Sequence, residues 1–73
     1  MTVQELNILV GQNIRYYRKL KGWYVKQLAD KIGVTHWITS RHENGTTFPE
    51  MKNLLFYADV LGVEVSQLFE KQG

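Results

Sequence analysis

Apolar residues recur at helical spacing from the first residues of the chain onward. One stripe, with its members three or four positions apart, consists of Val3, Leu6, Val10, Ile14 and Tyr17. This spacing places all of them on one face of an α-helix, which we expect to be buried. A T-x-x-E capping box at Thr2 and Glu5 predicts the start of this helix, and Gly22 predicts its end.

A second apolar stripe lies about 100° further round the same helix. It consists of Leu9, Tyr16 and Leu20. We expect these side chains to be partly exposed. They are either the scattered apolar surface that soluble proteins ordinarily carry or a contact for a partner.

Two shorter helices are predicted in the middle of the chain. The first spans about residues 25–32, and its inward face carries Leu28, Ala29 and Ile32. Gly33 ends it, because glycine adopts the left-handed conformation without steric cost. Thr35 is a suitable N-cap for the second helix, over about residues 36–44. Two helices joined by a short turn that contains glycine form a helix-turn-helix unit.

The last third of the chain predicts two more helices. A helix over about residues 50–61 follows Pro49 and ends at Gly62. Its expected buried residues are Met51, Leu54, Leu55, Ala58 and Leu61. A short final helix over about residues 66–70 turns Leu68 and Phe69 inward. The pattern therefore predicts an all-α single domain over residues 1–73, with five helices and no strand.

The length and composition of the chain argue against several classes of function. A chain of 73 residues buries only about 60% of its unfolded surface, which leaves no room for an enclosed catalytic cleft. Cysteine is absent, and the longest apolar run, residues 54–58, is far too short to span a bilayer. His36 and His42 are six residues apart with no third ligand nearby. We expect a cytoplasmic binding module without a leader segment, enzymatic activity, cofactor or metal.

The charge balance is mildly basic. Nine Lys and Arg residues against seven Asp and Glu residues give a net charge of +2, which is low for a nucleic-acid binder. Four of the nine bases gather at Arg15, Arg18, Lys19 and Lys21. They either contact phosphates or complement the dipole at the end of the first helix.

Several short motifs occur in order along the chain. They are Ala29, Gly33-Val34-Thr35, Ser40-Arg41, Glu43-Asn44-Gly45, Pro49, Ala58, Leu61-Gly62-Val63 and Leu68-Phe69. In these residues the chain resembles the Cro/repressor-type (lambda-repressor-like) helix-turn-helix family over roughly residues 10–70. The resemblance implies a compact five-helix domain that reads double-stranded DNA with the second helix of the unit. It also implies a set of DNA-contacting positions, here His36, Trp37, Ser40, Arg41 and Asn44. The side chains present add Lys26 and Lys52 as candidate phosphate donors in the DNA-binding interpretation.

The chain departs from the family pattern mainly on that surface. Tyr24 stands where a Ser or Thr cap is usual, and Val25 where a glutamine usually contacts the DNA backbone. Trp37 replaces a short polar residue, and Phe48 lies in a loop that is commonly polar or basic. Further departures are Phe56 in the fourth helix and the polar residues Thr39 and His42 at usually apolar core positions.

Two interpretations of this surface follow. Aromatic residues and arginine are enriched at protein–protein hot spots, which favours a protein partner bound through Tyr24, Val25, His36, Trp37, Ile38, Arg41 and Phe48. The family's DNA-reading face would then have been remodelled, by evolution or by design. The alternative is a sequence-specific DNA-binding transcriptional regulator in which Arg41 reads guanine. Either a monomer or a homodimer fits, and the dimer contact would involve Leu68 and Phe69 or the Leu9–Tyr16–Leu20 stripe.

Overall fold

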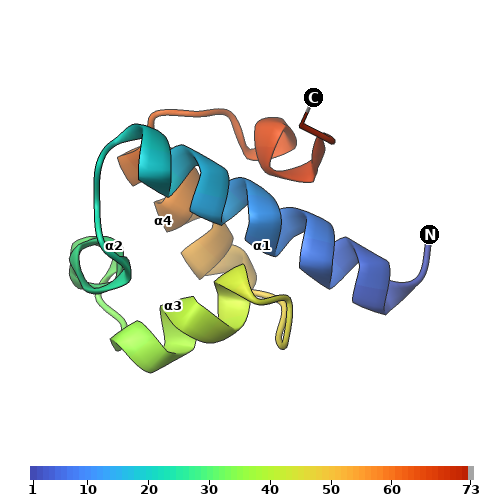
Figure 1. Cartoon of the computed structure of the whole chain (residues 1–73), viewed down its shortest axis with the longest axis horizontal. Coiled ribbons are helices and arrows are strands. Elements are labelled where there is room, and N and C mark those ends of the chain that lie inside the picture. The colour runs from blue at the N-terminus through green and yellow to red at the C-terminus, as the bar shows by residue number, and fades with distance from the viewer. Residues whose placement is uncertain (73) are drawn as a thin grey trace.

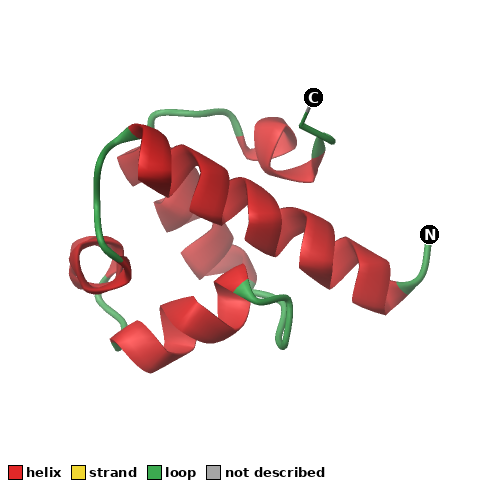
Figure 2. Cartoon of the chain, in the orientation of Figure 1, coloured by secondary structure: helices red, strands yellow, loops and turns green. Residues whose placement is uncertain are grey.

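The computed structural model describes residues 1–72 and contains four α-helices followed by one 3-10 helix (Figure 1). These are α1 (Val3–Leu20), α2 (Val25–Ile32), α3 (His36–Glu43), α4 (Met51–Leu61) and η1 (Val65–Phe69). Within the described residues there is no strand (Figure 2). The predicted all-α fold is confirmed, with a 3-10 helix as its last element.

The long helix α1 runs across the molecule, with α3 on one side of it and η1 on the other (Figure 1). Its predicted capping box is present: the Glu5 amide donates to Thr2 Oγ1 at 3.0 Å, and the Thr2 amide donates to Glu5 Oε1 at 2.8 Å. None of the helices in the described part of the chain combines the length and hydropathy that a bilayer crossing needs.

The hydrophobic core lies where α1, α2, α4 and η1 meet. Its buried members are Val10, Ile14, Leu28, Ile32, Leu54, Tyr57, Ala58, Leu61 and Leu68. Because Leu68 is fully buried, it cannot belong to a dimer surface, and only the partly exposed Phe69 remains available there. Of the second stripe on α1, Tyr16 and Leu20 are exposed and Leu9 is half-buried, as predicted.

Four residues expected to be buried are exposed instead, namely Val3, Met51, Leu55 and Phe69. Val3 is 76% exposed because the first turn of α1 projects beyond the packed helices (Figure 1). Met51 is 66% exposed, and Leu55 shares its side of α4. The buried stripe of α4 is centred on Tyr57, which was not among the expected buried residues. Leu54, Tyr57, Ala58 and Leu61 have the i, i+3, i+4, i+7 spacing of one helix face.

A close approach of α1 to α3 depends on Gly11. A Cβ atom at this position would lie 2.3 Å from the His42 carbonyl oxygen and 2.7 Å from that of Glu43. Any side chain would therefore push the end of α3 away from α1.

The predicted helix end at Gly33 is confirmed, since this residue adopts φ 82° after α2.

Candidate functional site

The exposed face of α3 is the main feature of the site. Thr35 caps the helix as predicted, its Oγ1 accepting a hydrogen bond from the Ile38 amide at 3.3 Å. The inward face carries Thr39, His42 and Glu43, all of which are buried. On the opposite side lie Trp37, Arg41 and Asn44, spaced i, i+4, i+7 and all exposed. One line of α3 thus presents an indole, a guanidinium and a carboxamide to the exterior.

The other predicted contact residues surround this line unevenly. Trp37 is 71% exposed and Tyr24, just before α2, is 78% exposed. Lys26, His36, Ile38 and Lys52 are also exposed, whereas Val25 and Ser40 are half-buried. The His36 ring packs against the Trp37 ring, with centroids 4.7 Å apart and an interplanar angle of 35°. Phe48 instead lies beside Phe69 of η1, with ring centroids 6.2 Å apart.

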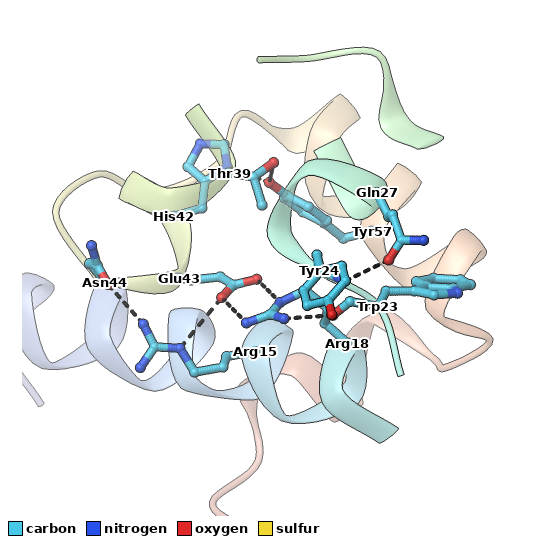
Figure 3. A network of polar contacts seen from close by, with 10 residues as sticks. All are labelled: Arg15, Arg18, Trp23, Tyr24, Gln27, Thr39, His42, Glu43, Asn44 and Tyr57. Carbon is cyan, nitrogen blue, oxygen red and sulfur yellow. Dashed lines mark hydrogen bonds and ion pairs between the residues drawn. The ribbon is translucent and has the colours of Figure 1, made fainter. Parts of the chain in front are cut away.

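A buried ion pair fixes the C-terminal end of α3 against α1 (Figure 3). Arg18 donates from Nε to Glu43 Oε2 at 2.7 Å and from Nη2 to Glu43 Oε1 at 3.0 Å. The Arg18 Nη1 group also donates to the Trp23 carbonyl oxygen at 2.7 Å. Both charged side chains are almost completely buried. Arg18 is therefore not available to phosphate, and Glu43 links α3 to α1 rather than serving only the helix end.

Arg15 extends this ion pair toward the surface. Its Nε lies 3.4 Å from Glu43 Oε1, and its Nη2 donates to Asn44 Oδ1 at 2.8 Å (Figure 3). Because the Asn44 oxygen accepts this bond, the assigned amide orientation leaves its NH₂ group as the free donor end. The predicted contact residue Asn44 is thus held in a defined orientation by α1.

A second polar network lies beneath α3. The Tyr57 hydroxyl is 3.0 Å from Thr39 Oγ1 and 2.8 Å from His42 Nδ1, and the His42 and Tyr57 rings meet edge to face (Figure 3). Thr39 and His42, noted as polar replacements at core positions, therefore share one buried partner in α4. Burial raises the pKa of Tyr57 to about 12. Burial also lowers the pKa of His42 from its ordinary value of 6.5, against the opposing effect of the Glu50 carboxylate.

The start of α2 compensates in part for its missing cap. The Tyr24 side chain makes no capping hydrogen bond, but its amide donates to Gln27 Oε1 at 2.7 Å. Lys26, one residue into the helix, lies 3.4 Å from Asp30 in an exposed ion pair. Exposed pairs of this kind contribute little stability, so the Lys26 ammonium group can exchange partners readily.

Comparisons with known proteins place these features in context. Residues 14–68 match the model of a family described as Helix-turn-helix. The HTH-type transcriptional regulators SlrR and SinR of Bacillus subtilis (strain 168) are 37% and 35% identical to the chain over 65 residues, which is 88% of it. The chain spans only 43% of SlrR and 59% of SinR.

Solved structures show the same architecture. The restriction-modification controller protein C.AhdI from Aeromonas hydrophila superposes with a TM-score of 0.87 at 26% identity, over 94% of this chain and 100% of that chain. The N-terminal DNA binding domain of SinR from Bacillus subtilis superposes with a TM-score of 0.80 at 34% identity, over 88% of this chain and 94% of that chain. The arrangement of α2 and α3 is thus shared with these two solved structures.

Proposed function

Because the chain belongs to the Cro/repressor-type helix-turn-helix family, we propose that it binds double-stranded DNA as a domain of a transcriptional regulator, with α3 in the major groove. The named functions of SlrR and SinR support this alternative over the protein partner that the exposed aromatic residues favoured. They give no support to a designed binder. Since the chain spans about half the length of these relatives, the proposal concerns DNA binding alone.

The proposal rests on the difference between the two faces of α3, of which one is fixed to the rest of the domain and the other is exposed. Its inner face is fixed to α1 by the Arg18–Glu43 ion pair and to α4 by the Tyr57 hydroxyl. Its outer face presents Trp37 and Arg41 to the exterior. A helix held rigidly on one side and exposed on the other fits a major groove about 12 Å wide. Arg41 is the side chain on this face best suited to guanine, whose O6 and N7 accept a bidentate pair of hydrogen bonds.

Backbone contacts would come from the residues around α3. Lys26 in the first turn of α2 and Lys52 in the first turn of α4 are exposed ammonium groups next to helix N-termini. The NH₂ group of Asn44, oriented by Arg15, adds a neutral donor at the end of α3. Phosphate contacts of this kind set the position of a protein on DNA, whereas base contacts set its specificity.

Binding to random-sequence duplex DNA at about 50 mM and about 200 mM salt tests the proposal. A domain that contacts phosphates through a few basic side chains should bind detectably in low salt and weaken as salt rises. Absence of binding at low salt would contradict the proposal and return attention to a protein partner. The contact residues, the cytoplasmic location and the lack of enzymatic activity stay predictions.

A further inference from the structure

We propose that Trp37 recognises thymine in the major groove, through both the C5 methyl group and the O4 atom of that base. This inference rests on the proposed function, because it requires α3 to lie in the groove. It adds a base preference and identifies the side chain that departs most from the expected polar surface as the residue that carries it.

The position of Trp37 satisfies the geometric requirement. The N-terminal part of a recognition helix is the part that contacts base edges. Trp37 is the second residue of α3, and its side chain is 71% exposed on the outward line of the helix. The His36 ring packs against it at a centroid distance of 4.7 Å, within the range of attractive aromatic pairs. This contact limits the rotamers of the indole before DNA arrives, so less conformational entropy is lost on binding.

The chemistry of the indole selects among the four bases. Tryptophan offers a large apolar ring and one N–H group, which can donate but not accept. Adenine and cytosine each place an amino donor in the major groove, and guanine offers acceptors without a methyl group. Thymine alone presents an acceptor, O4, beside a methyl group. It is therefore the only base edge that matches both parts of the Trp37 side chain.

The neighbouring arginine limits where this thymine can lie. Arg41 follows Trp37 by four residues on the same line of α3, a separation of about 6 Å along the helix axis. Base pairs are spaced by about 3.4 Å, so the two side chains reach positions about two base pairs apart. The preferred duplex should contain a thymine and a guanine with this separation.

The test uses thymine and uracil, which differ only in the C5 methyl group. A duplex is first enriched from a randomised duplex library by the unmodified protein and sequenced. Each thymine is then replaced by uracil in turn, and binding is measured by fluorescence anisotropy. One replacement should weaken binding about fourfold, which corresponds to about 0.8 kcal/mol for one buried methylene-sized group.

Three variants assign this effect to Trp37. Trp37→Phe keeps an apolar ring and should remain sensitive to uracil, whereas Trp37→Gln should bind thymine and uracil duplexes equally. Phe56→Ala removes another exposed aromatic residue, on α4 and outside both sets of predicted contact residues, and should keep the full sensitivity of the unmodified protein. Thermal denaturation of each variant checks the fold, which should be unchanged because both side chains lie on the surface.

The outcomes separate this inference from the proposed function. Equal affinity for the thymine and uracil duplexes, with binding otherwise intact, would overturn the role of Trp37 and leave DNA binding in place. Sensitivity that persists in Trp37→Gln would overturn it too, since another side chain would then contact the methyl group. Failure to enrich any duplex, together with no salt-dependent binding, would overturn both proposals.

Discussion

At the scale of single residues, the Tyr57 hydroxyl group explains two departures that look unfavourable in the sequence. Thr39 and His42 place polar atoms in the interior, where each would be costly without a hydrogen-bond partner. One hydroxyl serves both, because a tyrosine hydroxyl can donate one hydrogen bond and also accept hydrogen bonds. The three residues therefore have to be considered as a single unit when any one of them is changed.

Tyr57→Phe should lower the free energy of unfolding by about 1–3 kcal/mol, because it leaves Thr39 and His42 without their buried partner. Urea denaturation followed by circular dichroism measures the change. Tyr16→Phe is the matched control: Tyr16 is exposed on α1, and its replacement should have an effect within about 0.5 kcal/mol. Equal stability of the two variants would show that the network contributes nothing.

The lowered pKa of His42 predicts a pH dependence of stability. The unfolded chain binds a proton near pH 6.5, while the folded protein resists protonation of this histidine to lower pH. Stability should therefore be constant with respect to His42 above pH 6.5 and fall as the pH drops below that value. Melting temperatures between about pH 8 and pH 5 measure the slope. His42→Asn removes the titrating group, and an unchanged slope in that variant would assign the dependence to other groups.

At the scale of helices, α1 is one of the elements that fix the position of α3. Gly11 allows the backbones to approach, and the Arg18–Glu43 pair holds them together a little further along. Removing one member of a buried ion pair leaves the other charge unpaired in the interior, which typically costs about 3–5 kcal/mol. The approach and the ion pair together fix the helix that we propose to read DNA.

Gly11→Ala should destabilise the protein by about 1–3 kcal/mol through overpacking against the end of α3. Helix propensity alone would give the opposite result, because alanine is favoured over glycine by about 1 kcal/mol inside a helix. The sign of the change in stability therefore shows whether overpacking against α3 is the larger effect. Thermal denaturation gives the change, with Gln12→Ala at the adjacent exposed position as control. A gain in stability for Gly11→Ala would mean that α1 and α3 can separate without loss.

At the scale of the whole molecule, the basic groups are divided between structure and surface. Arg18 is buried in an ion pair, and the Lys21 and Lys31 ammonium groups lie 5.9 and 4.5 Å from the centre of the Trp23 ring. With a net charge of only +2, few cations remain for phosphate. Base contacts should therefore carry a large share of the specific affinity.

Arg41→Ala should weaken binding to the enriched duplex by about 1–3 kcal/mol and relax the preference at one guanine position. Lys71→Ala is the matched control, because it removes one positive charge from the C-terminal segment, on the side of α1 opposite α3 (Figure 1). Anisotropy titrations of both variants at the same salt concentration compare them. Similar losses for the two variants would indicate non-specific attraction rather than base recognition.

The sequence predicts the ends of helices better than it predicts the contacts between helices. The starts of α1 and α3 and the end of α2 could be predicted within a residue, since Thr2, Thr35 and Gly33 act on their own neighbours. The exposure of Trp37 could be predicted from the resemblance to the helix-turn-helix family as well. The Arg18–Glu43 pair and the role of Tyr57 could not, because their partners are 25 and at least 15 residues away in the sequence.

The polar residues on the inward face of α3 also limit how far this helix can rotate about its own axis. An apolar contact tolerates a small rotation of a helix about its axis, whereas hydrogen bonds weaken steeply when their angles change. The bonds from Thr39 and His42 to one hydroxyl on α4 therefore hold α3 at a single azimuth. Substitution of the outward residues Trp37 and Arg41 should then change which bases are contacted without moving α3. We therefore expect that the base preference of the domain can be altered one base pair at a time.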